Sequence, residues 1–311
     1  MPATTTTHQS APSGEQHGIG HGRQQLVVTE VGATIRSYAV DGADVLDGFA
    51  LDDMCEGGRG QVLAPWPNRL GDGRYSFEGR SAAAALDEPE RHNAIHGLVR
   101  WLPWQVLSRA QNVLCLGCTL HAQPGYPWQL ALTMEYRLGR DGLSVTAGAT
   151  NIDRVAVPFG IGFHPYLAVS SSTIDTASLL VPARRRLVTD ERGLPTSSTA
   201  VAGSEYDFRT PRWVGTTRLD TAFTDLQPDP DGLVRVDLDD PGGRGVTLWM
   251  DDSFDYVMLY TGDTLEPPER RRSAVAVEPM TCPPDAFRSG QDLLRLEPGG
   301  SWTGRWGITP R

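Results

Sequence analysis

The stretch Gln129-Leu-Ala-Leu-Thr-Met-Glu-Tyr-Arg-Leu138-Gly-Arg-Asp141-Gly142-Leu-Ser-Val-Thr-Ala-Gly-Ala-Thr-Asn151 decides the fold of this chain. Two apolar, β-type runs, 129–138 and 143–151, lie on either side of an Asp-Gly pair. Asp-Gly between such runs is a strong hairpin signal, because a tight turn needs positive φ angles that these residues tolerate. The stretch therefore predicts two antiparallel strands joined by a turn at Asp141-Gly142.

Short runs of the same kind continue in both directions from this hairpin. The 34 glycines and 23 prolines are scattered between them, which is typical of turns and unlike a helical bundle. Neither a sustained helical period nor an alternation of strands and helices is present, which argues against Rossmann and TIM architectures. The sequence thus predicts an all-β, antiparallel fold. Its further predicted strands are 24–30, 34–40, 43–46, 104–107, 112–121, 179–182, 233–238, 245–250, 256–260 and 273–277.

The length of 311 residues is large for an ordinary domain but fits one large β-sandwich or barrel. Residues 1–23 are rich in Thr, Ser, Gly and His, so we expect a disordered N-terminal tail there. Ordered structure is expected to begin near Gln25. We predict one domain over residues 24–311.

Charge, hydropathy and cysteine usage argue against several classes of partner. A formal net charge of −10 leaves no basic surplus to displace the counterions of a nucleic acid. No apolar run approaches the roughly 20 residues that span a bilayer, and residues 1–23 lack the apolar core of a signal peptide. The cysteines form no disulfide framework for a chain of this size, and Cys115 and Cys118 lack a second pair to complete a zinc site. We expect a soluble, cytoplasmic monomer or homodimer with no nucleic-acid or membrane partner.

Three titratable residues stand at the ends of apolar, strand-like runs. They are His96 in Asn93-Ala-Ile-His96-Gly97, His164 in Gly162-Phe-His164-Pro-Tyr166, and Glu278 in Val-Ala-Val-Glu278-Pro-Met. A rigid sheet can aim such side chains into a cleft. Two imidazoles and one carboxylate can move protons at neutral pH without a cofactor. The pattern points to acid–base chemistry on a neutral, hydroxyl-rich substrate, and we expect no cofactor and no metal.

Metal sites and purely structural roles are the alternatives. His92 and His96 are four residues apart, yet no helical period surrounds them and the glutamate of HExxH is missing. An iron site built from His96, His164 and Glu278 is conceivable, but the expected local ligand spacing is absent. Arg69 alone could be a structural ion pair, and most of the tryptophans fit a core.

Seven short motifs follow one another in an order that resembles the aldose 1-epimerases, also called galactose mutarotases. They cover nearly the whole chain after the tail, which makes the resemblance specific where one tripeptide would mean little. The resemblance implies a large antiparallel β-sandwich, the galactose mutarotase-like supersandwich, and an aldose 1-epimerase activity on a free aldohexose. The motifs are Ala64-Pro-Trp-Pro-Asn68-Arg69 with its continuation to residue 77, Asn93 to Gly97, Gly125-Tyr126-Pro127, residues 160–166, Val181-Pro-Ala with Leu194-Pro-Thr, Leu219-Asp220-Thr-Ala-Phe, and Glu278-Pro.

Position by position, the resemblance implies that Glu278 is the general base and His164 the general acid. Substrate-binding positions of the family match His96, Arg69 and Asp220 and, less strongly, Tyr166 and Trp249. Interconversion of α and β anomers removes the proton of the O1 hydroxyl while the ring oxygen O5 gains one. A carboxylate base and an imidazolium acid on opposite sides of the hemiacetal suffice for these transfers.

The run His96-Gly97-Leu98-Val99-Arg100 departs from the common pattern of the family, which has a second glycine after His-Gly. An arginine at this spacing resembles the related hexose-6-phosphate epimerases, where arginines bind the phosphate. Asn93 and the run Asn68-Arg69-Leu-Gly-Asp-Gly favour a free sugar, and Arg100 is then expected to pack outside the catalytic centre. A hexose 6-phosphate substrate stays an alternative. A non-catalytic carbohydrate-binding protein is another, against which the intact Glu278 and His164 argue.

Overall fold

A computed structural model describes residues 11–311, and two large antiparallel sheets account for most of its regular structure. The nine-stranded sheet has the order β10-β11-β12-β13-β27-β23-β22-β17-β20. Its strands are β10 (Gln105–Arg109), β11 (Val113–Leu120), β12 (Leu130–Gly139), β13 (Gly142–Asn151), β27 (Ser301–Pro310), β23 (Gly245–Met250), β22 (Val234–Asp239), β17 (Ser178–Leu180) and β20 (Arg212–Trp213).

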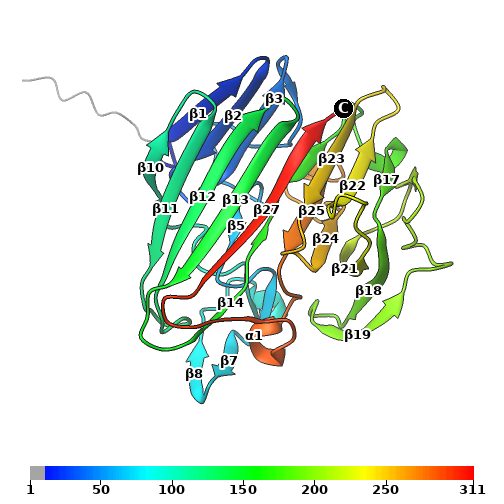
Figure 1. Ribbon diagram of the computed structural model, residues 1–311. Helices are drawn as coiled ribbons and strands as arrows, with labels where there is room; N and C mark the ends of the chain where they lie inside the picture. Colours follow the sequence, from blue (N-terminus) through cyan, green and yellow to red (C-terminus); the bar gives the residue numbers. More distant parts are fainter. Residues whose placement is uncertain (1–10) are drawn as a thin grey trace, which may run out of the picture.

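The eight-stranded sheet has the order β19-β18-β21-β24-β25-β15-β5, and β16 also pairs with β25. Figure 1 shows much of this sheet behind the nine-stranded one. Its strands are β19 (Pro195–Ala200), β18 (Ala183–Thr189), β21 (Asp220–Leu226), β24 (Tyr256–Tyr260), β25 (Ala274–Met280), β15 (Gly162–Phe163), β16 (Tyr166–Ala168) and β5 (Val62–Leu63).

Smaller elements complete the described chain. A four-stranded sheet contains β1 (Gln16–His21), β2 (Gln24–Thr29), β3 (Ile35–Val40) and β4 (Ala43–Asp44). The two-stranded pairs are β14 (Val157–Phe159) with β26 (Leu294–Leu296), β6 (Arg69–Gly71) with β9 (Asn93–Ile95), and β7 (Arg74–Phe77) with β8 (Arg80–Ala83). Helical turns are α1 (Ala286–Ser289), η1 (Pro89–Arg91), η2 (Ile174–Thr176) and η3 (Pro268–Arg270). No helix within residues 11–311 is long and apolar enough to cross a membrane.

The predicted hairpin is confirmed, and with it the all-β antiparallel fold. β12 and β13 pair over their whole length, from Leu130 opposite Asn151 to Gly139 opposite Gly142. Gly142 has a φ of +123°, a conformation that a side chain would strain. Along β12 buried residues alternate with partly or fully exposed ones, so one face of the nine-stranded sheet packs inward.

The main hydrophobic core lies between the two large sheets. On the side of the nine-stranded sheet it contains Trp306 of β27, whose ring centroid lies 5.1 Å from that of Phe163 of β15. On the side of the eight-stranded sheet it contains Val275 and Val277 of β25. Successive side chains of a strand point to opposite faces. The residues next to these valines, Glu278 among them, therefore point away from this core.

The N-terminal boundary of the predicted domain needs a correction. We expected residues 1–23 to be disordered, but residues Gln16–His21 form β1 and pair with β2, with Ile19 opposite Leu26. This polar strand is held by its backbone pairing with β2 and by one buried apolar side chain, Ile19. Neither feature changes the amino-acid composition enough to distinguish the strand from a disordered tail. Residues 1–10 of the predicted tail lie outside the described residues. That residues 24–311 form one domain stays a prediction.

Candidate active site

Six of the seven site residues predicted from the sequence surround one cavity of about 520 Å³. The cavity opens on the face of the eight-stranded sheet that points away from the main core. In the register of this sheet, Met258 of β24 lies opposite Glu278 of β25, and Asp220 of β21 lies opposite Tyr260 of β24. Because alternate residues share a face, neighbouring strands place these side chains together. The predicted residues in the lining are Glu278, His164, His96, Arg69, Asp220 and Tyr166.

Glu278 and His164 are in direct contact at the base of the cavity. His164 Nε2 lies 3.3 Å from Glu278 Oε1, and the two side chains are only 6% and 2% exposed. Burial raises the pKa of the Glu278 carboxyl well above its usual value, and the charge of Asp220 raises it further. Burial lowers the pKa of the His164 imidazole to about 3. Although the contact has the length of an ion pair, these directions place the proton of the pair on the carboxyl.

Three buried polar atoms around this contact have no hydrogen-bond partner among residues 11–311. They are Glu278 Oε2, His164 Nδ1 and His96 Nδ1. Unpaired buried polar atoms are uncommon, because each loses its hydration without replacement. Their concentration in one cavity indicates that the site is built for a polar ligand.

His96 lies against His164 with its ring edge to face, at a centroid distance of 5.3 Å. Its backbone has a φ of +64°, a left-handed conformation that is uncommon outside glycine and recurs at functional sites. The neighbouring turn has the same property, since Asn68 has a φ of +54° and its carbonyl accepts the His96 N–H at 2.9 Å. Burial lowers the pKa of His96 well below its usual value, and the positive charges of Arg100 and Arg69 lower it further.

Arg69 belongs to a charged group at the side of the cavity. Its Nε donates to Glu88 Oε2 at 2.9 Å and its Nη2 to Glu88 Oε1 at 3.0 Å, which is a bidentate pair. Asn93 Nδ2 donates to the same carboxylate at 2.8 Å. Asp220 Oδ2 lies 3.6 Å from Arg69 Nη2 and its side chain is 41% exposed. The structural ion pair considered for Arg69 is therefore formed, and its guanidinium also lines the cavity.

Tyr166 stacks on the imidazole of His164. The two rings lie 5.0 Å apart at an angle of 14°, and the Tyr166 hydroxyl donates to the carbonyl of Gly57 at 2.8 Å. Tyr166 thus lines the cavity, although its hydroxyl is already bound to the backbone.

Trp249 is the one predicted site residue that the structure does not bring to the cavity. It lies on β23 of the nine-stranded sheet, where Leu248 and Met250 are buried in the core. Strand alternation therefore points Trp249 to the opposite face, where the guanidinium of Arg305 lies 6.0 Å from its ring. The expectation that Trp249 contacts the sugar is wrong.

Arg100 also differs from expectation, because it lines the cavity instead of packing outside it. Its Nη2 forms an ion pair with Asp87, and its side chain is 14% exposed. The guanidinium lies 5.3 Å from the ring of Trp101. A positive charge therefore stands in the wall of the site, partly neutralised by Asp87.

Sequence reasoning did not single out Glu88, Tyr260 or Met258, which also line the cavity. Glu88 precedes η1 in a polar loop, and no local pattern signals its pairing with Arg69, 19 residues away. Tyr260 and Met258 could have been found from the alternation along β24 once its register with β25 was known. Across residues 11–311, no three His, Cys, Asp or Glu side chains are grouped so as to hold a metal ion.

Comparison with known proteins adds a family and a fold to this geometry. The sequence model of the family described as Aldose 1-epimerase matches residues 15–309. The uncharacterized protein YihR of Escherichia coli K12 is 32% identical over 289 residues, which cover 92% of this chain and 90% of that protein. A GalM/aldose epimerase homologue from C. elegans has a TM-score of 0.86 at 17% identity, covering 96% of this chain and 98% of that chain. Galactose 1-epimerase from Lactobacillus acidophilus NCFM has a TM-score of 0.78 at 18% identity, covering 95% and 94%.

Proposed function

The chain belongs to the aldose 1-epimerase family, and from this premise we propose that it interconverts the α and β anomers of a free aldohexose. The observation that carries the proposal is the buried contact between Glu278 and His164 in a cavity lined by polar side chains. An acid–base pair that shares one proton is what anomer exchange needs, because the reaction moves protons without net gain or loss.

With the sugar bound, the proton of the pair passes from Glu278 to His164 across their contact. Ionised Glu278 then accepts the proton of the O1 hydroxyl, and protonated His164 donates its proton to the ring oxygen O5. The C1–O5 bond breaks and C1 becomes an aldehyde carbon. At this point Glu278 carries a proton and His164 is neutral, which is the state that burial favours in the free protein. Rotation about the C1–C2 bond presents the other face of the aldehyde. Ring closure then reverses both proton transfers.

The contact between the acid and the base limits how the sugar enters. We expected the two groups on opposite sides of the hemiacetal, but a 3.3 Å separation leaves no room for a sugar between them. O1 and O5 are bonded to the same carbon, so a hemiacetal placed beside the pair presents one oxygen to each group. The hydroxyls further along the ring then face Arg69 and Asp220, which bind them by charge-assisted hydrogen bonds. His96 lies beside His164 and takes a hydroxyl on its free Nδ1.

The position of Arg100 supports hexose 6-phosphate as a second candidate substrate. A guanidinium in the wall of the cavity can bind a phosphate in a bidentate manner. The ion pair with Asp87 opposes this role, because the carboxylate already neutralises the arginine and would repel a phosphate. We therefore prefer the free sugar.

Polarimetry on freshly dissolved α-glucose, α-galactose and α-glucose 6-phosphate, with EDTA-treated protein, tests the proposal. We expect faster mutarotation of at least one free sugar than in buffer alone. Acceleration with the phosphosugar alone would move the assignment to the second candidate. A protein that binds these sugars without accelerating mutarotation would be a carbohydrate-binding protein and would contradict an epimerase function.

A further inference from the structure

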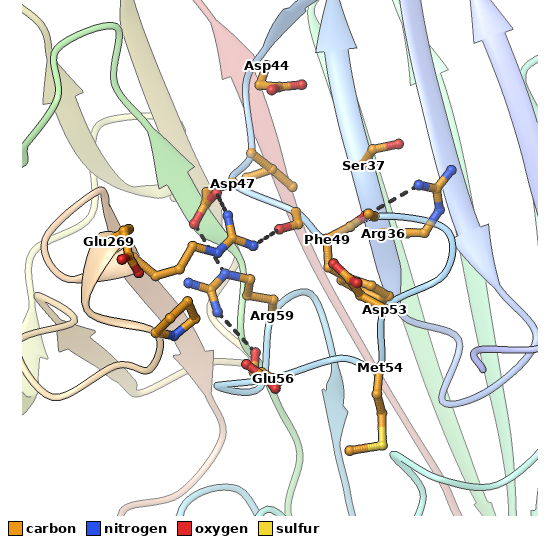
Figure 2. A pocket seen from close by; sticks show the side chains of 15 residues that line it. Arg36, Ser37, Asp44, Asp47, Phe49, Asp53, Met54, Glu56, Arg59 and Glu269 are labelled. Atoms are coloured by element: carbon orange, nitrogen blue, oxygen red, sulfur yellow. Dashed lines mark hydrogen bonds and ion pairs between the residues drawn. The ribbon is translucent and has the colours of Figure 1, made fainter. Parts of the chain in front are cut away.

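A second cavity, of about 670 Å³, lies directly behind one wall of the candidate active site. The wall is the segment Glu56-Gly-Gly-Arg59-Gly60: Gly57 and Gly58 line the active-site cavity, whereas Glu56 and Arg59 line the second one. Figure 2 shows Arg59 in this second cavity, between Asp47 and Glu56. We call residues 56–60 the glycine-rich wall.

Both backbone groups of His164, its N–H and its carbonyl, are hydrogen-bonded to the glycine-rich wall or to the residue that follows it. The Gly60 N–H donates to the His164 carbonyl at 2.9 Å, and the His164 N–H donates to the carbonyl of the adjacent Gln61 at 3.2 Å. Gly58, with a φ of +74°, approaches the imidazole so closely that a Cβ there would lie 2.7 Å from His164 Cδ2. The position of this wall therefore sets the position of the imidazole.

Arg59 is the side chain that fixes the wall. It is 2% exposed, and its Nε lies 3.1 Å from Asp47 Oδ2 while its Nη1 donates to the Glu56 carbonyl at 3.2 Å. Its guanidinium carbon lies 4.8 Å from the ring centroid of Tyr166, the ring that stacks on His164. Arg270 Nη1 binds the other oxygen of Asp47 at 2.8 Å. A buried cation thus touches the aromatic ring beneath the proposed catalytic acid without lining the sugar cavity.

We propose that Arg59 is a positioning residue for His164, which it orients through the stacked ring of Tyr166 and through the glycine-rich wall. The inference rests on the proposed function, because it assigns a consequence for turnover. A desolvated guanidinium over the face of an aromatic ring stabilises that arrangement, so Arg59 favours one orientation of the Tyr166 ring. The charge of Arg59 has a second effect. Burial is the main cause of the lowered pKa of His164, and among the charged groups Arg59 lowers that pKa most.

Arg59→Met tests the proposal, because it keeps a long apolar side chain and removes the charge and the planar group. Asp47 keeps Arg270 as its partner, so no lone carboxylate is left behind. We expect kcat to fall roughly tenfold or more, since small misplacements of a reacting group are costly. KM should change little, because Arg59 does not line the sugar cavity. Arg59→Lys retains the charge but not the planar guanidinium that lies over Tyr166, so its kcat should fall less than that of Arg59→Met. If Arg59→Met does not fold, Arg59→Lys tests the proposal in its place.

Arg36→Gln is the matched control. Arg36 lines the same second cavity, and its side chain makes two hydrogen bonds, to Gln16 and to the Phe49 carbonyl. Neither partner is Tyr166 or a residue of the glycine-rich wall. Its kcat and KM should equal those of the wild type. Wild-type kcat in both Arg59 variants would overturn the proposal, as would a fall in kcat of the same size in Arg36→Gln.

A titration of the His164 imidazole by ¹⁵N NMR, without substrate, separates this inference from the proposed function. Burial keeps the pKa of the ring low in both proteins, and Arg59→Met removes a nearby positive charge that lowers it further. We therefore expect the His164 ring to begin to protonate at a higher pH in Arg59→Met than in the wild type. An unchanged titration in Arg59→Met would contradict the electrostatic part of the proposal. Because this readout needs no turnover, it holds even if the sugar substrate were misassigned.

Discussion

His164 Nε2 and Glu278 Oε1 lie 3.3 Å apart, and both side chains are almost completely buried. Their pKa shifts have opposite directions, upward for the carboxyl and downward for the imidazole, and the same principal cause, which is burial. The pair therefore holds one proton in an environment that disfavours charge on either group. The two positions of that proton correspond to the closed-ring and open-ring stages of the proposed reaction.

Glu278→Gln should reduce kcat by about 10²–10⁴-fold, because an amide cannot accept the O1 proton. The variant should also fold as stably as the wild type. Burial already favours the neutral carboxyl, and glutamine has nearly the shape of that form. Mutarotation rates and urea unfolding measure the two effects. Wild-type turnover in a folded Glu278→Gln protein would remove Glu278 from the role of base.

His164→Asn and Glu278→Gln should not be additive when combined. Both groups act on the one proton that they share, so removing either disables the pair. We expect the kcat of the double variant to lie within about tenfold of that of the weaker single variant. A double variant whose loss equals the product of the two single losses would show that the groups act independently.

The strands that carry the acid–base pair could be predicted from the sequence, since Val-Ala-Val-Glu278 ends an apolar, β-type run. The face on which each side chain lies depends on the register between strands, which is a long-range property. The same reasoning explains the error at Trp249, because an aromatic residue in a strand points to the core, to a cavity or outward according to its position. Without the register between strands, the alternation of residues along a strand shows which side chains share a face, but not whether that face lines the core, the cavity or the solvent.

The polar surroundings of the site were less accessible to sequence reasoning. Glu88 reaches Arg69 from a loop, and Asp47 reaches Arg59 and Arg270 across 12 and 223 residues. Ion pairs between loops leave no periodic pattern, and their partners are set by the tertiary fold. Arg100 was misplaced for the same reason, because its spacing from His96 says nothing of the cavity wall that it joins.

Arg69→Lys should weaken substrate binding and the protein together. A lysine cannot reproduce the two hydrogen bonds to Glu88, so the wall of the cavity loosens. Hydrogen bonds to charged groups contribute about 1.5–3 kcal/mol. A loss of that size in substrate binding raises KM tenfold or more, and a loss of the same size in the folded protein lowers the free energy of unfolding by about 1.5–3 kcal/mol. Steady-state kinetics and urea unfolding measure both. An unchanged KM would mean that Arg69 is only structural.

Acidification should destabilise the protein through its buried histidines. His96 and His164 have lowered pKa values, so from about pH 6.5 downward the unfolded chain binds protons that the folded protein does not. Their contribution to stability is complete above pH 6.5 and is lost as pH falls. Glu278 acts in the opposite sense, since its raised pKa makes its contribution decrease as pH rises above 4.5. Below pH 6.5 the two imidazoles have a larger effect on stability than the one carboxyl. Each proton that the unfolded chain binds in excess of the folded protein changes the free energy of unfolding by about 1.4 kcal/mol per pH unit.

His96→Gln isolates this effect, because it removes one buried imidazole of the two. Unfolding free energies at about pH 7 and pH 5 should differ less in the variant than in the wild type, by roughly 1 kcal/mol or more. Equal pH dependence in the two proteins would show that His96 is protonated as readily in the folded as in the unfolded state.

Exchange NMR between the α and β anomers of glucose and galactose at equilibrium tests the central claim most directly. Magnetisation transferred between the two anomeric proton signals reports ring opening and closure alone, with no net reaction. We predict measurable exchange with the EDTA-treated wild type on at least one of the two sugars, and exchange above the buffer rate that is slower by about a hundredfold or more with Glu278→Gln and with His164→Asn. Equal exchange in the wild type and in both variants, or none above buffer with the wild type on either sugar, would contradict the account.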